Sequence, residues 1–319
     1  MEATTDLILA GFFALEHQVA SVTAPVEQVV GDALKASFPE LTSKWTTFLA
    51  SIKSPYADQL PFMNPAHMLA LVAAYLVTVF AGKAFMSRMP EKFAMKNYAL
   101  AHNVVLTSLS AFMWLEVLRQ AYLGGYSLFG NGPKSPAENG LPMAKIIAVF
   151  YLSKILEFND TFIMVLKKNF HQISFLHVYH HASIFAVWWL VTFWAPTGEA
   201  YFSAMLNSFI HVIMYGYYFL SAMGVKQVVV VKKYITSGQM TQFVCMMIQA
   251  TYNILDATVF NPTPAGAKDA TRYPLALSTL LWVYMVSMLA LFGNFYRQDR
   301  KRDAARRAEL AKLKATKSQ

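Results

Sequence analysis

Long apolar runs separated by short polar segments dominate the chain. An apolar helix of about 20 residues crosses a hydrocarbon core roughly 30 Å thick. Seven runs reach this length, so the pattern predicts seven membrane-spanning helices. They are expected at residues 66–86, 98–123, 142–166, 172–194, 200–222, 231–256 and 273–296.

Composition indicates the same class of protein. The 319 residues are 56% hydrophobic and only 14% charged, which is too apolar for an ordinary soluble fold. The single cysteine, Cys245, excludes an intramolecular disulfide and a CxxC metal or redox site. We therefore expect an all-α, multi-pass membrane protein.

The basic residues indicate how the helices are oriented. The loops after the first, third and fifth spans, together with the segment after the seventh, hold 18 of the 27 Lys and Arg residues. The loops after the second, fourth and sixth spans hold only three. Because basic loops remain in the cytosol, the amino terminus is expected outside and the carboxyl terminus inside.

This orientation divides the chain into three parts. Residues 1–60 form an outer, luminal segment with seven acids against three bases, and we expect it to be retained because no secretory signal is evident. Residues 61–297 form the membrane domain, and residues 298–319 form a basic cytosolic tail. The tail accounts for most of the +9 net charge and is expected to lie near anionic lipid, so no nucleic-acid partner is expected.

Polar residues recur at helical spacing inside four consecutive spans, on the cytosolic half of each. Spacings of three and four place side chains on one helix face. Buried imidazoles and charges are costly without partners, so these stripes predict one polar chamber that opens to the cytosol and narrows into an apolar interior. The stripes are Lys154, Glu157, Asp160 and Thr161; His177, His180 and His181; Asn207, His211, Tyr215 and Tyr218; and Thr236, Gln239 and Gln242.

Such a chamber suits an amphiphile whose polar head stays in the cytosol while its hydrocarbon tail lies among the helices. An acyl-CoA has this shape. A histidine can attack a thioester to form an acyl-imidazole, or act as a general base near neutral pH. The pattern therefore indicates an enzyme that holds an acyl chain in a cytosol-facing tunnel.

The four stripes resemble the sequence boxes of the ELO fatty-acid elongases. The segment KILEFNDT (154–161) resembles the KxxExxDT box, and HVYHH (177–181) resembles the HxxHH box. NSFIHVIMYGYY (207–218) is similar to NxxxHxxMYxYY, and TSGQMTQ (236–242) is similar to TxxQxxQ. The resemblance covers about residues 60 to 300, and four boxes in this order are more specific than any one of them.

The resemblance implies a seven-helix enzyme of the endoplasmic reticulum that condenses an acyl-CoA with malonyl-CoA. Carbon dioxide is released and a 3-ketoacyl-CoA two carbons longer results. The resemblance implies that His180 accepts the acyl group, with His211 beside it and His177 and His181 as supporting groups or bases. The resemblance also implies that the thioester oxygen or the malonyl carboxylate is positioned by Asn207, Tyr215, Gln239 and Gln242. It implies that the histidines are oriented by Lys154, Glu157 and Asp160.

The resemblance also implies a substrate class and partners. Tyr179 within HVYHH and the run WWLVTF are similar to the polyunsaturated-acid branch of the family, which implies C18 to C20 polyunsaturated acyl-CoA substrates. No cofactor is expected, because acyl-CoA and malonyl-CoA are both substrates. Membrane lipid and the reductases and dehydratase of an elongation cycle are the other implied partners.

Three alternatives remain open at this stage. The histidines could hold two irons, as in membrane desaturases, but the remaining histidines are too scattered for such a site, and we expect no metal. Lys154, Glu157 and Asp160 could form a structural ion-pair patch instead of acting in catalysis. A seven-span receptor or a transporter would share the topology, although neither paired outer cysteines nor an internal repeat is present.

Other polar residues in the spans have simpler interpretations. Glu116 and Arg119 are three positions apart on one helix and are expected to pair. Cys245 follows Gln242 by three positions and is expected to pack rather than react. His102, near the start of the second span, could join the chamber or cap it.

Overall fold

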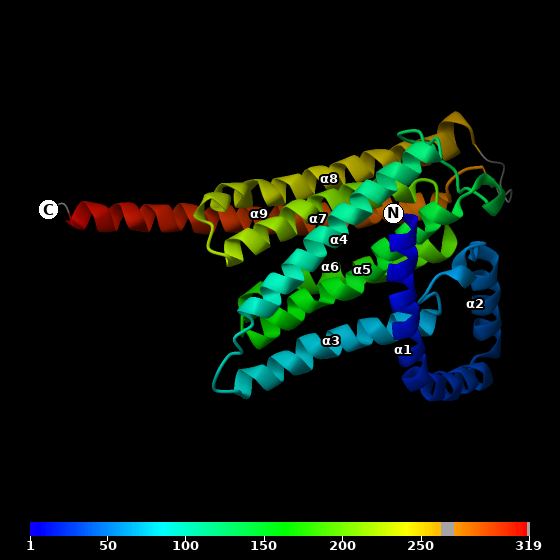
Figure 1. The fold of residues 1–319 in the computed structure, drawn as a ribbon, viewed down its shortest axis with the longest axis horizontal. Coiled ribbons are helices and arrows are strands. Elements are labelled where there is room, and N and C mark those ends of the chain that lie inside the picture. Colours follow the sequence, from blue (N-terminus) through cyan, green and yellow to red (C-terminus); the bar gives the residue numbers. More distant parts are fainter. Residues whose placement is uncertain (263–270, 318–319) are drawn as a thin grey trace.

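The computed structural model describes residues 1–262 and 271–317, and the regular elements in these residues are all helical. Helices α3 to α9 run side by side in an elongated bundle, and α9 continues beyond one end of it (Figure 1). We call that end of the bundle the tail side. The helices are α1 (Glu2–Ser37), α2 (Pro39–Ile52), α3 (Pro65–Arg88), α4 (Lys96–Leu123), α5 (Leu141–Leu166), α6 (Phe175–Trp194), α7 (Ala200–Ala222), α8 (Val229–Leu255) and α9 (Leu275–Lys317).

Local sequence signals explain where several helices begin. The Asn64 side chain accepts a hydrogen bond from the backbone N–H of Ala66 and precedes a proline at the start of α3. Ser174 caps α6 in the same way, through the backbone N–H of His177. Phe38 separates α1 from α2 with extended φ because the residue before a proline disfavours the helical conformation.

Each of the seven predicted apolar runs is a helix, with small differences at the ends. The run expected to start at residue 172 becomes α6 only at Phe175, because residues Phe170–Gln172 form a short 3₁₀ turn. The basic tail continues α9 as helix to Lys317, and the last two residues lie outside the described part.

Five helices in the described residues are long and apolar enough to cross a membrane. They are Glu2–Ser37, Pro65–Arg88, Lys96–Leu123, Lys226–Phe260 and Leu275–Ala305. Helix α5 falls outside this set because it holds four charged residues, Lys145, Lys154, Glu157 and Asp160, and α6 and α7 fall outside it because the histidines and other polar residues of their boxes make them less apolar. The architecture is that of a multi-pass membrane protein; by these criteria four of the seven predicted spans qualify, together with α1, which the apolar pattern did not predict as a span.

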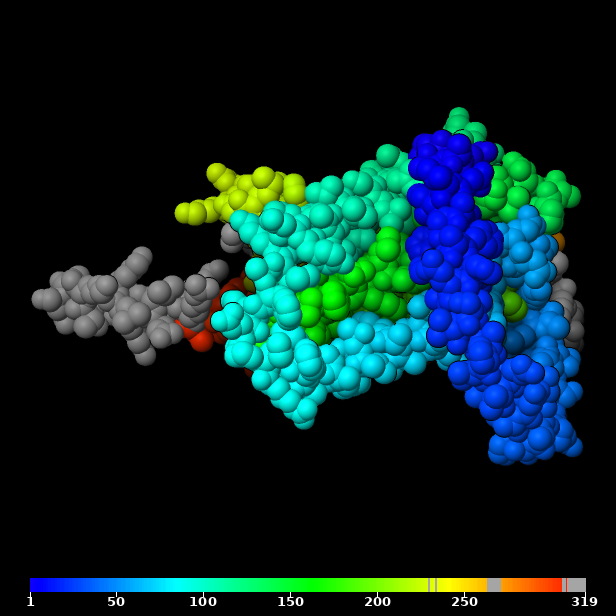
Figure 2. Space-filling model, turned by 60° about the horizontal axis from the view of Figure 1, so that its bottom comes forward, coloured from blue at the N-terminus to red at the C-terminus, as the bar shows by residue number. Residues whose placement is uncertain are grey.

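Helix α1 crosses the other helices instead of running along them (Figures 1 and 2). It buries Leu9 and Phe12 in the main core, and Lys145 of α5 donates to Asp6 at 2.7 Å. Two glutamates of α1 also contact the His67 ring of α3, Glu16 at Nδ1 and Glu27 at Nε2. The amino-terminal segment is therefore attached to the end of the bundle opposite the tail side.

Helix α5 lies at the centre of the bundle. Every side chain from Ile146 to Leu152 has an exposed fraction of 0%. A helix that is apolar on all sides is buried on all sides. This burial places the polar residues that follow in α5 inside the protein, where they contact neighbouring helices.

Candidate active site

A buried charged cluster joins α5 to α7. Lys154 is 1% exposed, and its Nζ donates to Glu157 Oε1 at 2.6 Å and to Asn207 Oδ1 at 3.2 Å. His211 Nδ1 lies 3.2 Å from the same Glu157 oxygen. The ion pair itself lies within α5, and the Asn207 and His211 contacts link it to α7. Losing either link would leave a buried charged group with fewer partners, so these contacts favour one relative position of the two helices.

The cluster also orients an amide toward the cavity described below. The Asn207 carbonyl oxygen accepts from the Lys154 ammonium, so its NH₂ group is directed elsewhere. Asn207 lines the cavity, where this NH₂ group can donate a hydrogen bond. A carbonyl oxygen that gains negative charge during a reaction needs such a donor.

Asp160 forms a second polar cluster, nearer the tail side. Its Oδ1 lies 3.0 Å from Nε2 of His102, and its Oδ2 accepts from the Tyr215 hydroxyl at 2.6 Å. Asp160 therefore connects α4, α5 and α7. The sequence left the role of His102 open, and the structure places it in this cluster.

The three histidines of HVYHH lie close together on α6. His177 Nε2 lies 2.7 Å from the Thr161 hydroxyl, which also contacts the Tyr75 hydroxyl at 3.2 Å. His181 packs against the His177 ring with centroids 4.4 Å apart. The His180 ring lies next to them, with its centroid 5.6 Å from that of His181, and it also lines a cavity. The three rings are therefore neighbours, as their spacing predicts, but of the three only His180 lines the cavity.

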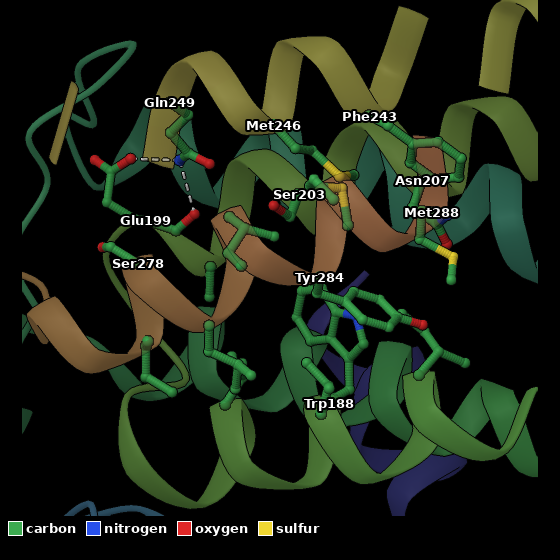
Figure 3. A pocket seen from close by; sticks show the side chains of 18 of the residues that line it. Trp188, Glu199, Ser203, Asn207, Phe243, Met246, Gln249, Ser278, Tyr284 and Met288 are labelled. Carbon is green, nitrogen blue, oxygen red and sulfur yellow. Dashed lines mark hydrogen bonds between the residues drawn. The ribbon is translucent and has the colours of Figure 1, made fainter. Parts of the chain in front are cut away.

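The cavity next to His180 runs between α6, α7, α8 and α9. At the His180 end it is also lined by Asn207 and Gln242, and Glu157 and His211 are close enough to His180 to interact with it electrostatically. Its middle is apolar and aromatic, and Trp188 and Tyr284 are among the residues that line it (Figure 3). The cavity volume is about 50 Å³, room for a few water molecules only.

The far end of the cavity is polar, which the sequence did not predict. Glu199 is 3% exposed at the start of α7 and accepts hydrogen bonds from Gln249 and from both nitrogens of Asn131 (Figure 3). Gly198, at φ +67°, brings the Asn131 backbone against this turn, since a Cβ there would lie 2.7 Å from the Asn131 oxygen. A single acid at a helix start has no periodic signal, so only the fold could identify it.

The remaining predicted site residues are less central. Gln239 is half-buried, and its amide contacts the Met214 sulfur at 3.6 Å. Thr236 is half-buried on the same helix, and Tyr218 is 42% exposed beside the Tyr215 ring. Tyr75, which sequence reasoning missed, is one tyrosine in an apolar run and shows no distinctive spacing.

Two simpler predictions about polar residues in the spans are confirmed. Arg119 donates twice to Glu116 at 2.8 Å, and Cys245 packs against the main core. Within residues 1–262 and 271–317, no group of three or more His, Cys, Asp or Glu side chains is arranged to hold a metal ion.

A multi-pass helical bundle that buries histidines beside charged pairs and a narrow apolar cavity has the features of a membrane-embedded lipid enzyme. Residues 60–308 match the ELO family, described as GNS1/SUR4. The chain therefore belongs to the ELO family of fatty-acid elongases.

Similarity to individual family members agrees with this assignment. The chain is 40% identical over 275 residues to fatty acid elongase 6 of Leishmania major, which covers 84% of this chain and 69% of the relative. It is 40% identical to very long chain fatty acid elongase 5 of Rattus norvegicus and 39% identical to the same protein of Homo sapiens, each covering 74% of this chain and 75% of the relative. The protein is thus a fatty-acid elongase, and family membership implies acyl-CoA and malonyl-CoA as its substrates.

Proposed function

We propose that this enzyme condenses a long-chain acyl-CoA with malonyl-CoA through an acyl group carried on His180. The observation that carries the proposal is the position of His180. Of the four predicted catalytic histidines, His180 alone lines the cavity. Its buried Nδ1 has no hydrogen-bond partner, which is also true of His181 Nδ1, so it is the position at the cavity that distinguishes His180. His177, His181 and His211 face other side chains instead.

The first half-reaction transfers the acyl group to the protein. The neutral His180 ring attacks the thioester carbonyl, the C–S bond breaks, and the ring proton passes to the departing CoA thiolate. His211 is the group we assign to relay this proton, since its Nδ1 is held beside Glu157 at 3.2 Å. The Asn207 NH₂ group donates to the carbonyl oxygen while negative charge develops on it.

The second half-reaction forms the carbon–carbon bond. Malonyl-CoA loses carbon dioxide, and the electron pair of the broken C–C bond gives an enolate. The enolate carbon attacks the acyl-imidazole, and the acyl carbon–nitrogen bond breaks. One proton returns the released imidazole anion to its neutral form and leaves a 3-ketoacyl-CoA two carbons longer. A dry site protects the acyl-imidazole from hydrolysis.

We assign C18 to C20 polyunsaturated acyl-CoA as the substrate class. The support is the resemblance at Tyr179 and WWLVTF and the likeness to relatives named very long chain fatty acid elongases. Our topology has seven spans in the endoplasmic reticulum membrane, a luminal amino terminus and a cytosolic tail, supported by the distribution of basic residues. Reductases and a dehydratase would complete the cycle.

The test is elongation of acyl-CoA with radiolabelled malonyl-CoA by purified protein in lipid vesicles. We expect His180→Ala to lower product formation by at least roughly 10²-fold, because it removes the acyl acceptor. His171→Ala is the matched control, since His171 is exposed and lies six residues before His177, where the box begins. Wild-type activity in His180→Ala would exclude His180 as the nucleophile.

A panel of C16 to C22 acyl-CoA substrates tests the chain preference in the same vesicles. The expected result is the highest kcat/KM for polyunsaturated C18 and C20 chains. Equal or better elongation of saturated chains would contradict the substrate assignment without touching the role of His180.

A further inference from the structure

A second, larger cavity lies on the opposite side of α6 from the catalytic one. It is a groove of about 520 Å³ between α3 and α6. Its walls are mainly apolar, and Lys83 lies at its tail-side end, close to the start of α6. The main apolar wall residues are Leu76, Val79, Phe80, Val178 and Ala182.

The groove and the catalytic cavity are separated where α6 meets α9. Tyr179 and Ser183 of α6 line the groove, whereas Tyr284 of α9 lines the catalytic cavity. Ser183 Oγ lies 2.9 Å from the Tyr284 hydroxyl, and the Tyr179 hydroxyl lies 3.2 Å from Ser287 Oγ. These two hydroxyl pairs form the α6–α9 seam.

The direction of each hydrogen bond shows how the seam can part. Ser183 donates its own proton to the Tyr179 carbonyl, and Ser287 donates to the Tyr284 carbonyl at 2.7 Å. When each serine proton is used within its own helix in this way, the tyrosine hydroxyl is the donor across the seam. When the helices separate, the serines keep their backbone partners and only two tyrosine hydroxyls lose theirs.

The catalytic cavity must widen before it can hold a fatty chain. Its 50 Å³ is about a tenth of the groove's 520 Å³. Close-packed interiors do not yield such space without movement of the surrounding helices. The two hydrogen bonds of the α6–α9 seam join neutral hydroxyl groups, while the α5–α7 contact joins the buried Lys154 and Glu157 of α5 to Asn207 and His211 of α7.

We propose that the α3–α6 groove is the membrane-side binding site for the hydrocarbon chain of the acyl-CoA, and that the chain passes through the α6–α9 seam into the catalytic cavity. This proposal rests on the proposed function. An apolar chain entering from lipid avoids contact with water throughout. Lys83 at the mouth supplies a positive charge for the CoA phosphates, which would remain at the tail side.

Filling the groove tests the binding site. In proteoliposomes, Ala182→Trp is expected to raise KM for a C20 polyunsaturated acyl-CoA at least tenfold and to leave KM for malonyl-CoA unchanged. Leu76→Trp fills the same groove from α3 and should act alike, so the test does not depend on one variant folding. Ala73→Trp, on the exposed face of α3 outside the groove, is the matched control and should match wild type.

Loosening the seam tests the passage. Tyr284→Phe and Tyr179→Phe each remove one donor, and we expect a two- to fivefold faster single-turnover acylation by the long-chain substrate. An unchanged or slower acylation in both variants, or an unchanged acyl-CoA KM in both groove-filling variants, would overturn the proposal.

The same experiment separates this proposal from the proposed function. A hexanoyl chain has much less hydrocarbon to bind in the groove, so Ala182→Trp should slow acylation by hexanoyl-CoA far less than acylation by the long-chain substrate. Equal loss with the short and long substrates would overturn the groove as a chain site. If wild-type protein never carries an acyl group, the histidine mechanism fails, while the KM comparison still tests the groove.

Discussion

At the residue scale, the account depends on how a membrane interior holds charge. Lys154 and Glu157 are both buried and bonded to each other, and each has a further partner on α7. A buried ion pair is weak evidence for stability, because desolvation offsets much of the attraction. Its contacts with Asn207 and His211 make it a candidate for holding those two side chains in place.

Replacing Glu157 should separate the effect of the ion pair on stability from its effect on activity. We expect Glu157→Gln to destabilise the protein by about 3–5 kcal/mol, because the Lys154 ammonium is left without its partner. Thermal unfolding in detergent measures the loss. The double variant Lys154→Met, Glu157→Leu should recover most of the stability while remaining inactive; recovery of activity as well would show that the pair is only structural.

The sequence predicted which residues belong to the buried polar set better than it predicted the partner of each side chain. Spacing identified Lys154, Glu157, His180 and Asn207 as one buried set. It could not show that only His180 of the three box histidines lines the cavity, since that depends on which helices pack against α6. Glu199 was missed for a similar reason: its partners come from a distant loop and from α8.

At the element scale, α1 is attached to the bundle but lies away from His180. Its contacts are with α3 and α5 and with Arg119 of α4, and the family match begins only at residue 60. Removing residues 1–37 should lower the melting temperature by several degrees and leave condensation within about twofold of the full chain. A folded but inactive truncated protein would show that α1 takes part in the site.

A buried tyrosine, Tyr56, at the end of the bundle opposite the tail side should make the stability of the protein depend on pH. Burial raises the pKa of Tyr56 from its ordinary value of 10.0 to about 12, and its hydroxyl donates to the Lys134 carbonyl at 2.8 Å. A raised tyrosine pKa means that the folded state favours the neutral phenol. This stabilisation is complete below pH 10 and is lost as the pH rises toward 12.

Thermal melts between pH 8 and 12 measure this dependence. Wild type should lose stability progressively above pH 10, and Tyr56→Phe, which cannot ionise, should lose less over the same range. Identical slopes for the two proteins would show that Tyr56 does not contribute.

The apolar pattern predicted the positions of the helices well, but it predicted less well which helices are apolar enough to span a membrane. All seven predicted runs are helical, since length and apolarity are properties of each run alone. Helices α5 to α7 look less like membrane spans because they contain polar and charged residues. A spanning helix can carry such residues where they contact protein rather than lipid. Helix α1 shows the converse: it is apolar enough to span, yet it lies across the bundle.

At the scale of the whole molecule, the arrangement combines a charged, hydrogen-bonded core around α5 with a narrow cavity along α6 and α9. In the proposed mechanism, the core holds the reacting groups in place, and the cavity takes up the fatty chain once it has widened. Membership of the ELO family states that the molecule elongates fatty acids. The geometry adds a specific claim, that His180 carries the acyl group between the two substrates.

The most direct test is to incubate the protein with acyl-CoA in the absence of malonyl-CoA, digest it, and locate the added acyl mass on its peptides. The account predicts the acyl group on His180, lost on addition of malonyl-CoA as 3-ketoacyl-CoA forms. An acyl group on another residue, or normal turnover with no acylated protein at any time, would contradict it.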